Sequence, residues 1–349
     1  MSSAVAAPRP EPYSLRVANP APIFVVGVAR SGTTLLQALL GAHPRIAAPP
    51  EMHWFLRIYH QRDYWGALDS PAAVRRLVAE TLDMPGGMLN DIGITVDEVV
   101  AQLPGHGVSY PDVLAAVMTT FAQRQGKERW SEKTPHQSPD EIWAAFQSAQ
   151  VVHLVRDPRD VVASVARAPF TNAGNGPAAT ARAWREFNAA AAAAGRGAGP
   201  KRYLLVRYED LCNEPEPVMD RVFDFLGEQR VPGIADDLEA RRPAVATAAW
   251  WTHSALHFVR PVPQPGRGLR FGRRCLVTRM TRSLLAEFGY ETGSPVQTAV
   301  GTAAYAFVKA RDRLKRTPPL PAGDPDRQHQ RVNELIDRML AEAQRSRPK

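Results

Sequence analysis

The chain has 349 residues, of which 44% are hydrophobic, and carries a formal net charge of +8 at pH 7. No run approaches the roughly 18 to 20 consecutive apolar residues of a membrane helix, and Met1 to Pro22 lacks the basic head and apolar core of a secretory signal. We therefore expect a soluble, cytoplasmic protein. The two cysteines, Cys212 and Cys275, provide neither a disulfide framework nor a metal-ligand cluster.

The positive charge is concentrated in two parts of the chain. Arg260 to Arg282 contains seven Arg and no acidic residue, and the segment from Val296 to the C-terminus has 11 Lys and Arg against 6 Asp and Glu. The remainder is net acidic. This distribution fits an anionic cofactor and a solvated tail better than a nucleic-acid-binding face, and neither zinc-finger spacing nor interleaved basic and aromatic residues are present.

Short apolar runs alternate with helical patterns along the chain. Ile23 to Val26 predicts a buried strand, and Thr33 to Ala42 predicts a helix with leucines at helical spacing. Val151 to Val155 and Tyr203 to Val206 predict two further strands, whose unbroken apolar character is typical of a parallel sheet covered on both faces. The pattern therefore predicts an α/β fold with a P-loop-like doubly wound sheet, mainly parallel and flanked by helices.

Helical patterns also occupy the segment between the first two of these strands. Ala72 to Leu82 and Val113 to Gln123 are examples, and we expect residues 52–130 to form a helical insertion over the site. Gly195 to Pro200 predicts a surface turn.

Three parts of the chain are expected from these patterns. Residues 1–20 form a flexible segment, residues 21–295 the main domain, and residues 296–349 a helical extension with a Pro-rich linker. One stripe of apolar residues near the C-terminus predicts a helix that packs on its own domain or forms a homodimer contact: Val332, Leu335, Ile336, Met339, Leu340 and Ala343.

The most informative motif is Gly27-Val28-Ala29-Arg30-Ser31-Gly32-Thr33-Thr34, between the first strand and the first helix. Its G-x4-G spacing is typical of a P-loop, whose backbone N–H groups and helix N-terminus surround a phosphate-like anion. A Walker loop has Lys at the position of Thr33, whereas here the cation is Arg30, inside the loop. The missing Lys argues against ordinary nucleoside triphosphate chemistry.

Two blocks resemble those of sulfotransferases that use 3'-phosphoadenosine-5'-phosphosulfate (PAPS). VGVARSGTTLLQALLGAHPRI resembles their 5'-phosphosulfate loop, especially in the tyrosylprotein branch and its bacterial relatives, which read R-S-G-T-T. VVHLVRDPRDVVASV resembles the 3'-phosphate-binding strand and helix, where a Ser follows an Arg by eight positions, as Ser164 follows Arg156. The resemblance implies that these two residues bind the 3'-phosphate and that the loop binds the phosphosulfate through Arg30, Ser31, Gly32, Thr33 and Thr34.

Transfer of the sulfuryl group to a hydroxyl needs a base for the acceptor's proton. The resemblance implies that Glu51 has this role, because it follows the His-Pro after the first helix as in the tyrosylprotein branch; His53 and His136 are the alternatives. Lys133 lies in Trp-Ser-Glu-Lys-Thr-Pro, which resembles the Lys-Thr-Pro block of bacterial members, and is expected to neutralise the leaving group together with Arg30. A surface ion pair with Glu132 is the alternative for Lys133.

Two more cofactor contacts are implied. Tyr208 lies in Arg-Tyr-Glu-Asp-Leu, which resembles the family's Y-E-D-L block near the nucleotide, and the acids after it are expected to be caps or turn residues. Arg273 belongs to a segment that resembles the last cofactor loop, R-K-G-x-x-G-x-W, without its Lys and Trp, and is assigned to the 3'-phosphate. His153 is expected to be a hydrogen-bonded core residue, whereas Trp250, Trp251 and Phe258 line either an acceptor pocket or a core.

The sequence thus predicts sulfuryl transfer from PAPS to a hydroxyl, or an amine, of a small molecule, glycan or peptide, with release of PAP and without a metal. One alternative is a P-loop small-molecule kinase that uses Mg²⁺ and ATP. The other is an inactive PAP-binding scaffold, in which Glu51 and Lys133 lie far from the loop.

Overall fold

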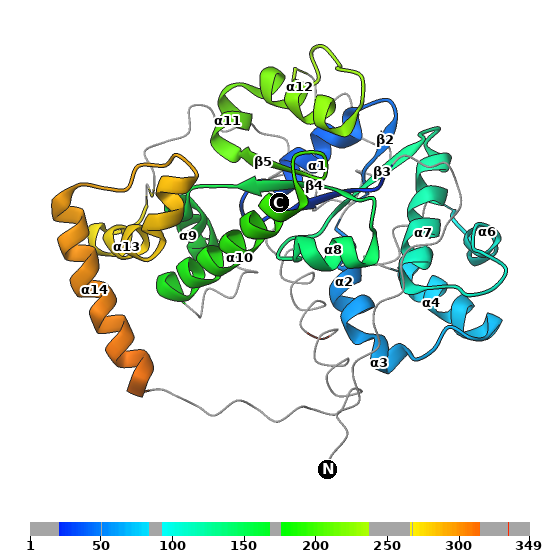
Figure 1. Cartoon of the computed structure of the whole chain (residues 1–349), viewed down its shortest axis with the longest axis horizontal. Helices are drawn as coiled ribbons and strands as arrows, with labels where there is room; N and C mark the ends of the chain where they lie inside the picture. The colour runs from blue at the N-terminus through cyan, green and yellow to red at the C-terminus, as the bar shows by residue number, and fades with distance from the viewer. Residues whose placement is uncertain are drawn as a thin grey trace, which may run out of the picture.

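A computed structural model of the chain describes residues 21–49, 51–83, 93–167, 176–236, 266 and 268–314, together with Glu334, and for 311–314 the backbone alone. Its centre is a five-stranded sheet in the order β2-β3-β1-β4-β5 (Figure 1). All four strand pairs are parallel, which confirms the predicted α/β class. The strands are β1 (Ile23–Val26), β2 (Ile46–Ala47), β3 (Arg129–Lys133), β4 (Gln150–Val155) and β5 (Tyr203–Arg207).

Helices surround this sheet on both faces and extend beyond both of its ends (Figure 1). In the described part of the chain they are α1 (Thr33–Ala42), α2 (Trp54–Arg57), the 3-10 helix η1 (Tyr59–Gln61), α3 (Arg62–Trp65), α4 (Pro71–Asp83), α6 (Val96–Ala101), α7 (Tyr110–Arg124), α8 (Pro139–Ala145), α9 (Pro158–Arg167), α10 (Gly176–Ala198), α11 (Tyr208–Asn213), α12 (Pro215–Leu226), α13 (Phe271–Glu287) and α14 (Pro295–Leu314). None of the helices described here is long and apolar enough to cross a membrane.

Strand β1 belongs to two hydrophobic cores at once. Ile23 and Val25 pack with α1 and α12 on one face of the sheet, and Phe24 and Val26 pack with α7 and α8 on the other. Successive side chains of a strand point to opposite faces, so a central strand covered on both sides must be apolar throughout. All four residues are 0% exposed. The loop that follows β1 therefore starts from a fixed position.

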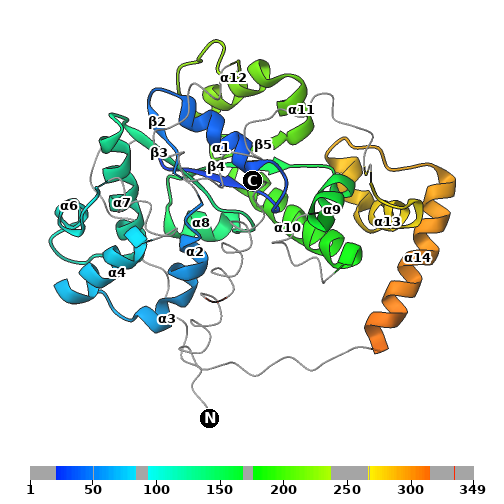
Figure 2. The same cartoon turned by 180° about the vertical axis from the view of Figure 1, so that it is seen from behind.

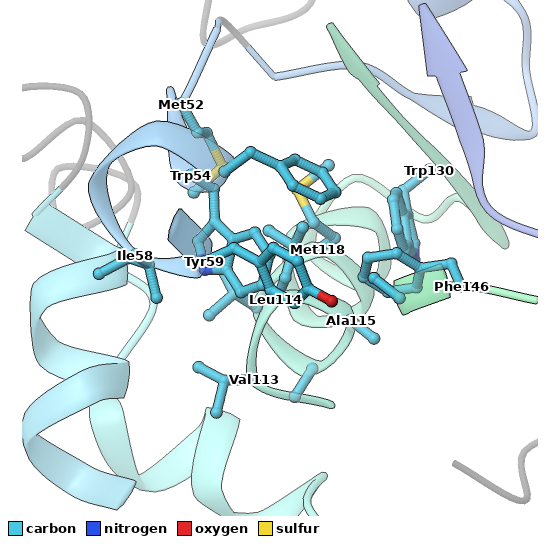
Figure 3. Packing of buried hydrophobic residues seen from close by; sticks show 14 of the residues in the cluster. Met52, Trp54, Ile58, Tyr59, Val113, Leu114, Ala115, Met118, Trp130 and Phe146 are labelled. Atoms are coloured by element: carbon cyan, nitrogen blue, oxygen red, sulfur yellow. The ribbon is translucent and has the colours of Figure 1, made fainter. Parts of the chain in front are cut away.

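Helices α3, α4, α6 and α7 form a lobe at one end of the sheet, and α13 and α14 lie at the other end (Figures 1 and 2). The predicted helical patches of the insertion are present as α4 and α7. Figure 3 shows how aromatic residues of the insertion, Trp54 and Tyr59, pack in the same cluster as Trp130 of β3 and Phe146, which follows α8. This packing fixes the start of the insertion against the sheet.

The predicted turn over Gly195 to Pro200 is wrong in its first half, because α10 continues to Ala198 and Gly199 follows with φ 83°. Gly195 is present for a packing reason. A Cβ atom there would lie 2.4 Å from ring atoms of Tyr203 on β5, so the glycine allows the helix to approach the sheet. The predicted helix near 332–343 lies outside the described residues apart from Glu334, as do Trp250, Trp251 and Phe258.

We predict that Gly195→Ala lowers the free energy of unfolding by about 1 to 3 kcal/mol, because an overpacked ring contact must relax by moving the helix or Tyr203. Gly197→Ala is the matched control in the same helix, since its Cβ would meet no atom within 4 Å. That variant should be neutral or more stable by up to about 1 kcal/mol. Urea unfolding followed by circular dichroism compares the two, and equal stabilities would contradict the packing of α10 on β5.

Candidate active site

The loop between β1 and α1 has the geometry of an anion-binding P-loop. Arg30 and Gly32 have positive φ angles of 72° and 92°, and these bring the chain sharply round into α1. Gly32 is the N-cap of α1 and makes no side-chain cap hydrogen bond. The N–H groups of Gly32, Thr33 and Thr34 have no intrahelical carbonyl to bind. They are the donors with which a helix N-terminus holds an anion.

Two further features fit a phosphate-like ligand at this loop. The Ser31 hydroxyl is buried and finds no hydrogen-bond partner among the described residues, which is unusual for a buried polar group. A Cβ atom at Gly32 would lie 2.2 Å from the ring of Tyr208, and one at Gly27 would lie 2.6 Å from the Leu154 carbonyl oxygen. The glycines therefore let the loop lie directly on its neighbours and leave its backbone donors uncovered.

Glu51 and Lys133 lie next to this loop, joined in one polar cluster. The Lys133 Nζ is 2.8 Å from Glu51 Oε2 and donates to the Thr34 hydroxyl at 3.2 Å. The other carboxylate oxygen of Glu51 is 3.1 Å from His53 Nδ1. Side chains that are distant in sequence thus meet at the start of α1. Lys133 is not paired with Glu132, whose side chain must point to the opposite face of β3.

Burial alone would raise the pKa of Glu51, but the charges of Lys133 and His53 and their hydrogen bonds outweigh it and hold that pKa well below its usual range. Glu51 is therefore ionised at neutral pH. The reverse holds for Glu132, which the sequence suggested only as a surface partner of Lys133. It is 0% exposed, and burial, together with the nearby Glu51 carboxylate, raises its pKa well above the usual value. Because successive side chains of a strand point to opposite faces, Glu132 and its neighbour Lys133 have different surroundings.

A second cluster gathers Arg30, Arg156, Ser164 and Tyr208 at the other side of the loop. Arg30 Nε donates to the Ser164 hydroxyl at 3.2 Å, and Arg156 donates to the Arg30 carbonyl at 3.0 Å. The Arg156 guanidinium lies 4.4 Å from the ring centroid of Tyr208. Burial and then the neighbouring Arg156 lower the pKa of Arg30, as expected where two guanidinium groups are brought together. Such a cluster suits a phosphate.

Arg156 forms no ion pair with Asp157 or Asp160, the acids that follow it. Asp157 pairs instead with Arg159 at 2.6 Å, and Asp157 N–H donates to Glu209 Oε1 at 2.9 Å. Glu209 thus has the structural role expected for it. His153 is also satisfied as expected, with its ring nitrogens 2.6 Å from the Tyr203 hydroxyl and 2.8 Å from Asn188 Oδ1.

Arg273 is not brought into either cluster. It is exposed in the first turn of α13 and makes no hydrogen bond or ion pair with the described residues. The chain just before this helix does reach the site, because Gly266 N–H donates to Asp160 Oδ1 of α9 at 2.7 Å. The assignment of Arg273 to a 3'-phosphate therefore stays a prediction.

Backbone strain is concentrated in the same place. In the described part of the chain the non-glycine residues with positive φ are Arg30, His53 and His136, at 72°, 56° and 62°. Each costs on the order of 1 to 3 kcal/mol and persists where the surroundings enforce it, which is common at functional sites. All three contact the loop or Glu51: Arg30 is in the loop, His53 pairs with Glu51, and His136 Nε2 accepts a hydrogen bond from Ala29 N–H at 3.0 Å.

Comparison with known proteins agrees with this arrangement. Residues 22–232, more than half of the chain, match the model of the sulfotransferase family. The chain belongs to this family. Within the residues the structure describes, no three His, Cys, Asp or Glu side chains are grouped as a metal ion would require, and both cysteines are buried thiols outside any disulfide.

Relatives of this sulfotransferase-family chain include a protein-tyrosine sulfotransferase and a nodulation protein. It is 28% identical over 210 residues to protein-tyrosine sulfotransferase A of Caenorhabditis elegans, a match that covers 58% of this chain and 49% of that one. It is 28% identical over 236 residues to nodulation protein NoeE of Sinorhizobium fredii, covering 61% and 52%. The chain thus spans about half the length of these curated relatives.

A solved structure shares the fold. The sulfotransferase domain of the Synechococcus PCC 7002 olefin synthase superposes with a TM-score of 0.51 and 24% identity, covering 79% of this chain and 97% of that domain. The sulfotransferase domain of the curacin biosynthetic pathway gives the same TM-score at 18% identity, covering 78% and 98%. These likenesses concern the architecture of the sheet and its helices.

We predict that Lys133→Met raises the pKa of Glu51, because burial remains while the main opposing charge is lost. Carbon-detected NMR titration of the glutamate carboxyl groups measures this shift. Lys201→Met, which removes an exposed lysine at the turn before β5, is the control and should leave Glu51 unchanged. If the Glu51 pKa is the same in both variants, the pair with Lys133 does not form in solution.

Proposed function

We propose that this chain is a PAPS-dependent sulfotransferase that transfers a sulfuryl group to a hydroxyl acceptor and releases PAP. The observation that carries the proposal is the contact of Lys133 with both Thr34 and Glu51. It brings an ionised carboxylate and a cation to the N-terminus of α1, where a transferred anionic group would be bound. An inactive scaffold, in which these residues lie far from the loop, does not fit this contact.

The P-loop would bind the 5'-phosphosulfate of the nucleotide, and the cluster around Arg156 would bind its 3'-phosphate. Backbone donors of Gly32, Thr33 and Thr34 and the unpartnered Ser31 hydroxyl would hold the 5'-phosphosulfate. Arg156 and Ser164 would hold the 3'-phosphate, with Tyr208 under the Arg156 guanidinium. Arg30, expected from the sequence to share a leaving-group role, donates to Ser164, so we assign it to phosphate binding as well.

When bound, PAPS supplies an activated sulfuryl group whose bond to a 5'-phosphate oxygen breaks as the acceptor oxygen attacks. Glu51 is ionised and accepts the acceptor's proton. Lys133 and the N-terminus of α1 stabilise the negative charge that forms on the leaving oxygen. As Lys133 turns its charge towards that oxygen, Glu51 loses part of its counter-charge and its pKa rises, which favours proton uptake at the same moment.

The acceptor is proposed as a hydroxyl of a small molecule, glycan or peptide. Glu51 lies at the base of the insertion lobe, and the lobe's walls would select the acceptor. Location in the cytoplasm and a homodimer through the C-terminal helix stay predictions from the sequence.

The proposal is tested by comparing PAP with AMP, which lacks the 3'-phosphate. Wild type should bind PAP more tightly by about 2 kcal/mol or more, because Arg156 and Ser164 offer a charged contact and a hydroxyl bond to the 3'-phosphate. Arg156→Ala should remove most of this preference by weakening PAP and leaving AMP nearly unchanged. Calorimetric titration at one fixed salt concentration measures all four affinities.

Two outcomes would contradict the nucleotide assignment. Equal affinity of wild type for PAP and AMP would remove the 3'-phosphate site. Tighter binding of ATP with Mg²⁺ than of PAP would favour the P-loop kinase, the second candidate from the sequence. Arg202→Ala is a control, because this arginine packs on Trp143, 4.9 Å from its ring centroid, and contacts neither cluster.

We also predict that Glu51→Gln lowers kcat by roughly 10² to 10⁴ while the affinity for PAP changes little, because the amide keeps the shape of the acid and cannot accept the proton. Turnover of labelled PAPS with pooled hydroxyl acceptors measures the effect. Glu128→Gln, at an exposed ion pair with Arg45, should behave like wild type. Unchanged turnover of Glu51→Gln would transfer the role of base to His53 or His136.

A further inference from the structure

His136 is bound to the P-loop by two hydrogen bonds. Its backbone N–H donates to the Gly27 carbonyl at 2.9 Å, and its Nε2 accepts from the Ala29 N–H at 3.0 Å. The residue stands three positions after Lys133, and its φ of 62° lets the backbone and the ring reach the same loop. Its ring also packs edge-to-face on Phe187 of α10, with centroids 5.7 Å apart.

These contacts determine the tautomer of His136. Since Nε2 accepts a hydrogen bond, the neutral ring must carry its proton on Nδ1, and neither nitrogen then offers a lone pair to a substrate. In this arrangement His136 could act as the base only by giving up its hydrogen bond with the Ala29 N–H. A loop-holding role uses the same contacts without breaking any of them.

We propose that His136 is a positioning residue that holds the P-loop in its anion-binding form through the Ala29 N–H, and that it does so only while its ring is neutral. The part of the proposal that concerns PAP rests on the proposed function. Ser31 N–H donates to the Val28 carbonyl at 3.1 Å, so the two bonds to His136 and this one together fix residues 27–31. The helix donors that follow are then presented in one orientation.

The charges around the ring fit the neutral form. Enclosure of the ring lowers the pKa of His136, and the Glu51 carboxylate opposes this with a smaller effect. Phe187 has no charge, and His153, which packs on the same phenylalanine from β4, has its pKa lowered to about 4 by burial. Because folding lowers the His136 pKa from its ordinary value of about 6.5, the ring is neutral and the loop contact is present above the lowered pKa, and the contact is lost as the pH falls through that pKa.

The test uses substitutions that separate the acceptor atom from the ring. His136→Gln places an amide oxygen near the position of Nε2 and keeps an acceptor for Ala29, whereas His136→Phe keeps the ring packing and loses the acceptor. Amide hydrogen exchange of Ala29 should speed up roughly threefold to tenfold in His136→Phe, the equivalent of one hydrogen bond, and stay near wild type in His136→Gln. The affinity for PAP should fall by a similar factor in the first variant alone.

His136→Asn covers the case in which His136→Phe does not fold, because Asn tolerates positive φ and is too short to reach Ala29. It should exchange like His136→Phe. The pH dependence gives a second readout: the ratio of PAP dissociation constants, wild type over His136→Gln, should rise as the pH falls through the lowered pKa of His136, since Gln does not titrate. Titration of the phosphates of PAP cancels in this ratio.

Three results would overturn the proposal. Unchanged Ala29 exchange in His136→Phe and His136→Asn would show that the ring does not hold the loop. Loss of turnover in His136→Gln with normal Ala29 exchange would make His136 a base instead. A ratio of affinities that stays flat while NMR shows the His136 ring becoming protonated would remove the requirement for a neutral ring. If wild type binds no PAP, the proposed function fails, yet the exchange measurement still decides whether His136 holds the loop.

Discussion

The N-terminus of α1 is the constraint on which the site depends. No side chain caps it, and its first N–H groups need an acceptor that the helix cannot supply. Two carboxylates near the site are already paired with cations: Glu51 with Lys133 and Asp157 with Arg159. The helix end is therefore left for an anion from outside, and the positive φ angles at Arg30 and Gly32 keep the loop folded around it.

The two polar clusters divide the chemistry between them. At one side, the guanidinium groups of Arg30 and Arg156 lie beside Ser164 and Tyr208, which suits a phosphate. At the other, Lys133 is shared between Thr34 and Glu51, so in the proposed reaction a single cation would couple the leaving group to the base. The ion pair keeps Glu51 charged and would be weakened when charge develops on the leaving oxygen. Such coupling would make proton acceptance coincide with bond breaking.

Strong apolar patterns made much of the fold predictable. Strands β1, β4 and β5 were predicted from unbroken apolar runs, and helix α1 was predicted from leucines at helical spacing. Strand β3 was not, because Arg129-Trp130-Ser131-Glu132-Lys133 has no apolar run. Its polar residues are buried in specific contacts, such as Ser131 with Gln37 at 3.1 Å, which depend on the finished fold and leave no periodic signal. The turn predicted at Gly195 was wrong for a similar reason, because this glycine is explained by the close contact of α10 with Tyr203.

The candidate site shows the same contrast between features that follow from sequence motifs and features that depend on the finished fold. The family resemblance singled out Glu51, Lys133 and the loop, which are in contact in the structure, and also Arg156 and Ser164, which both contact Arg30; the roles of these residues stay predictions. It could not give the direction of the Arg30 side chain, the burial of Glu132 or the bond from Ala29 to His136, because each depends on which face of an element a residue occupies in three dimensions.

The most direct test of the central claim is a crystal structure of the protein with PAP. The account predicts the 5'-phosphate at the N–H groups of Gly32, Thr33 and Thr34, and the 3'-phosphate within hydrogen-bond distance of Arg156 and Ser164. Lys133 should lie between the 5'-phosphate and Glu51. A nucleotide bound in the opposite direction, or bound away from the start of α1, would contradict the account.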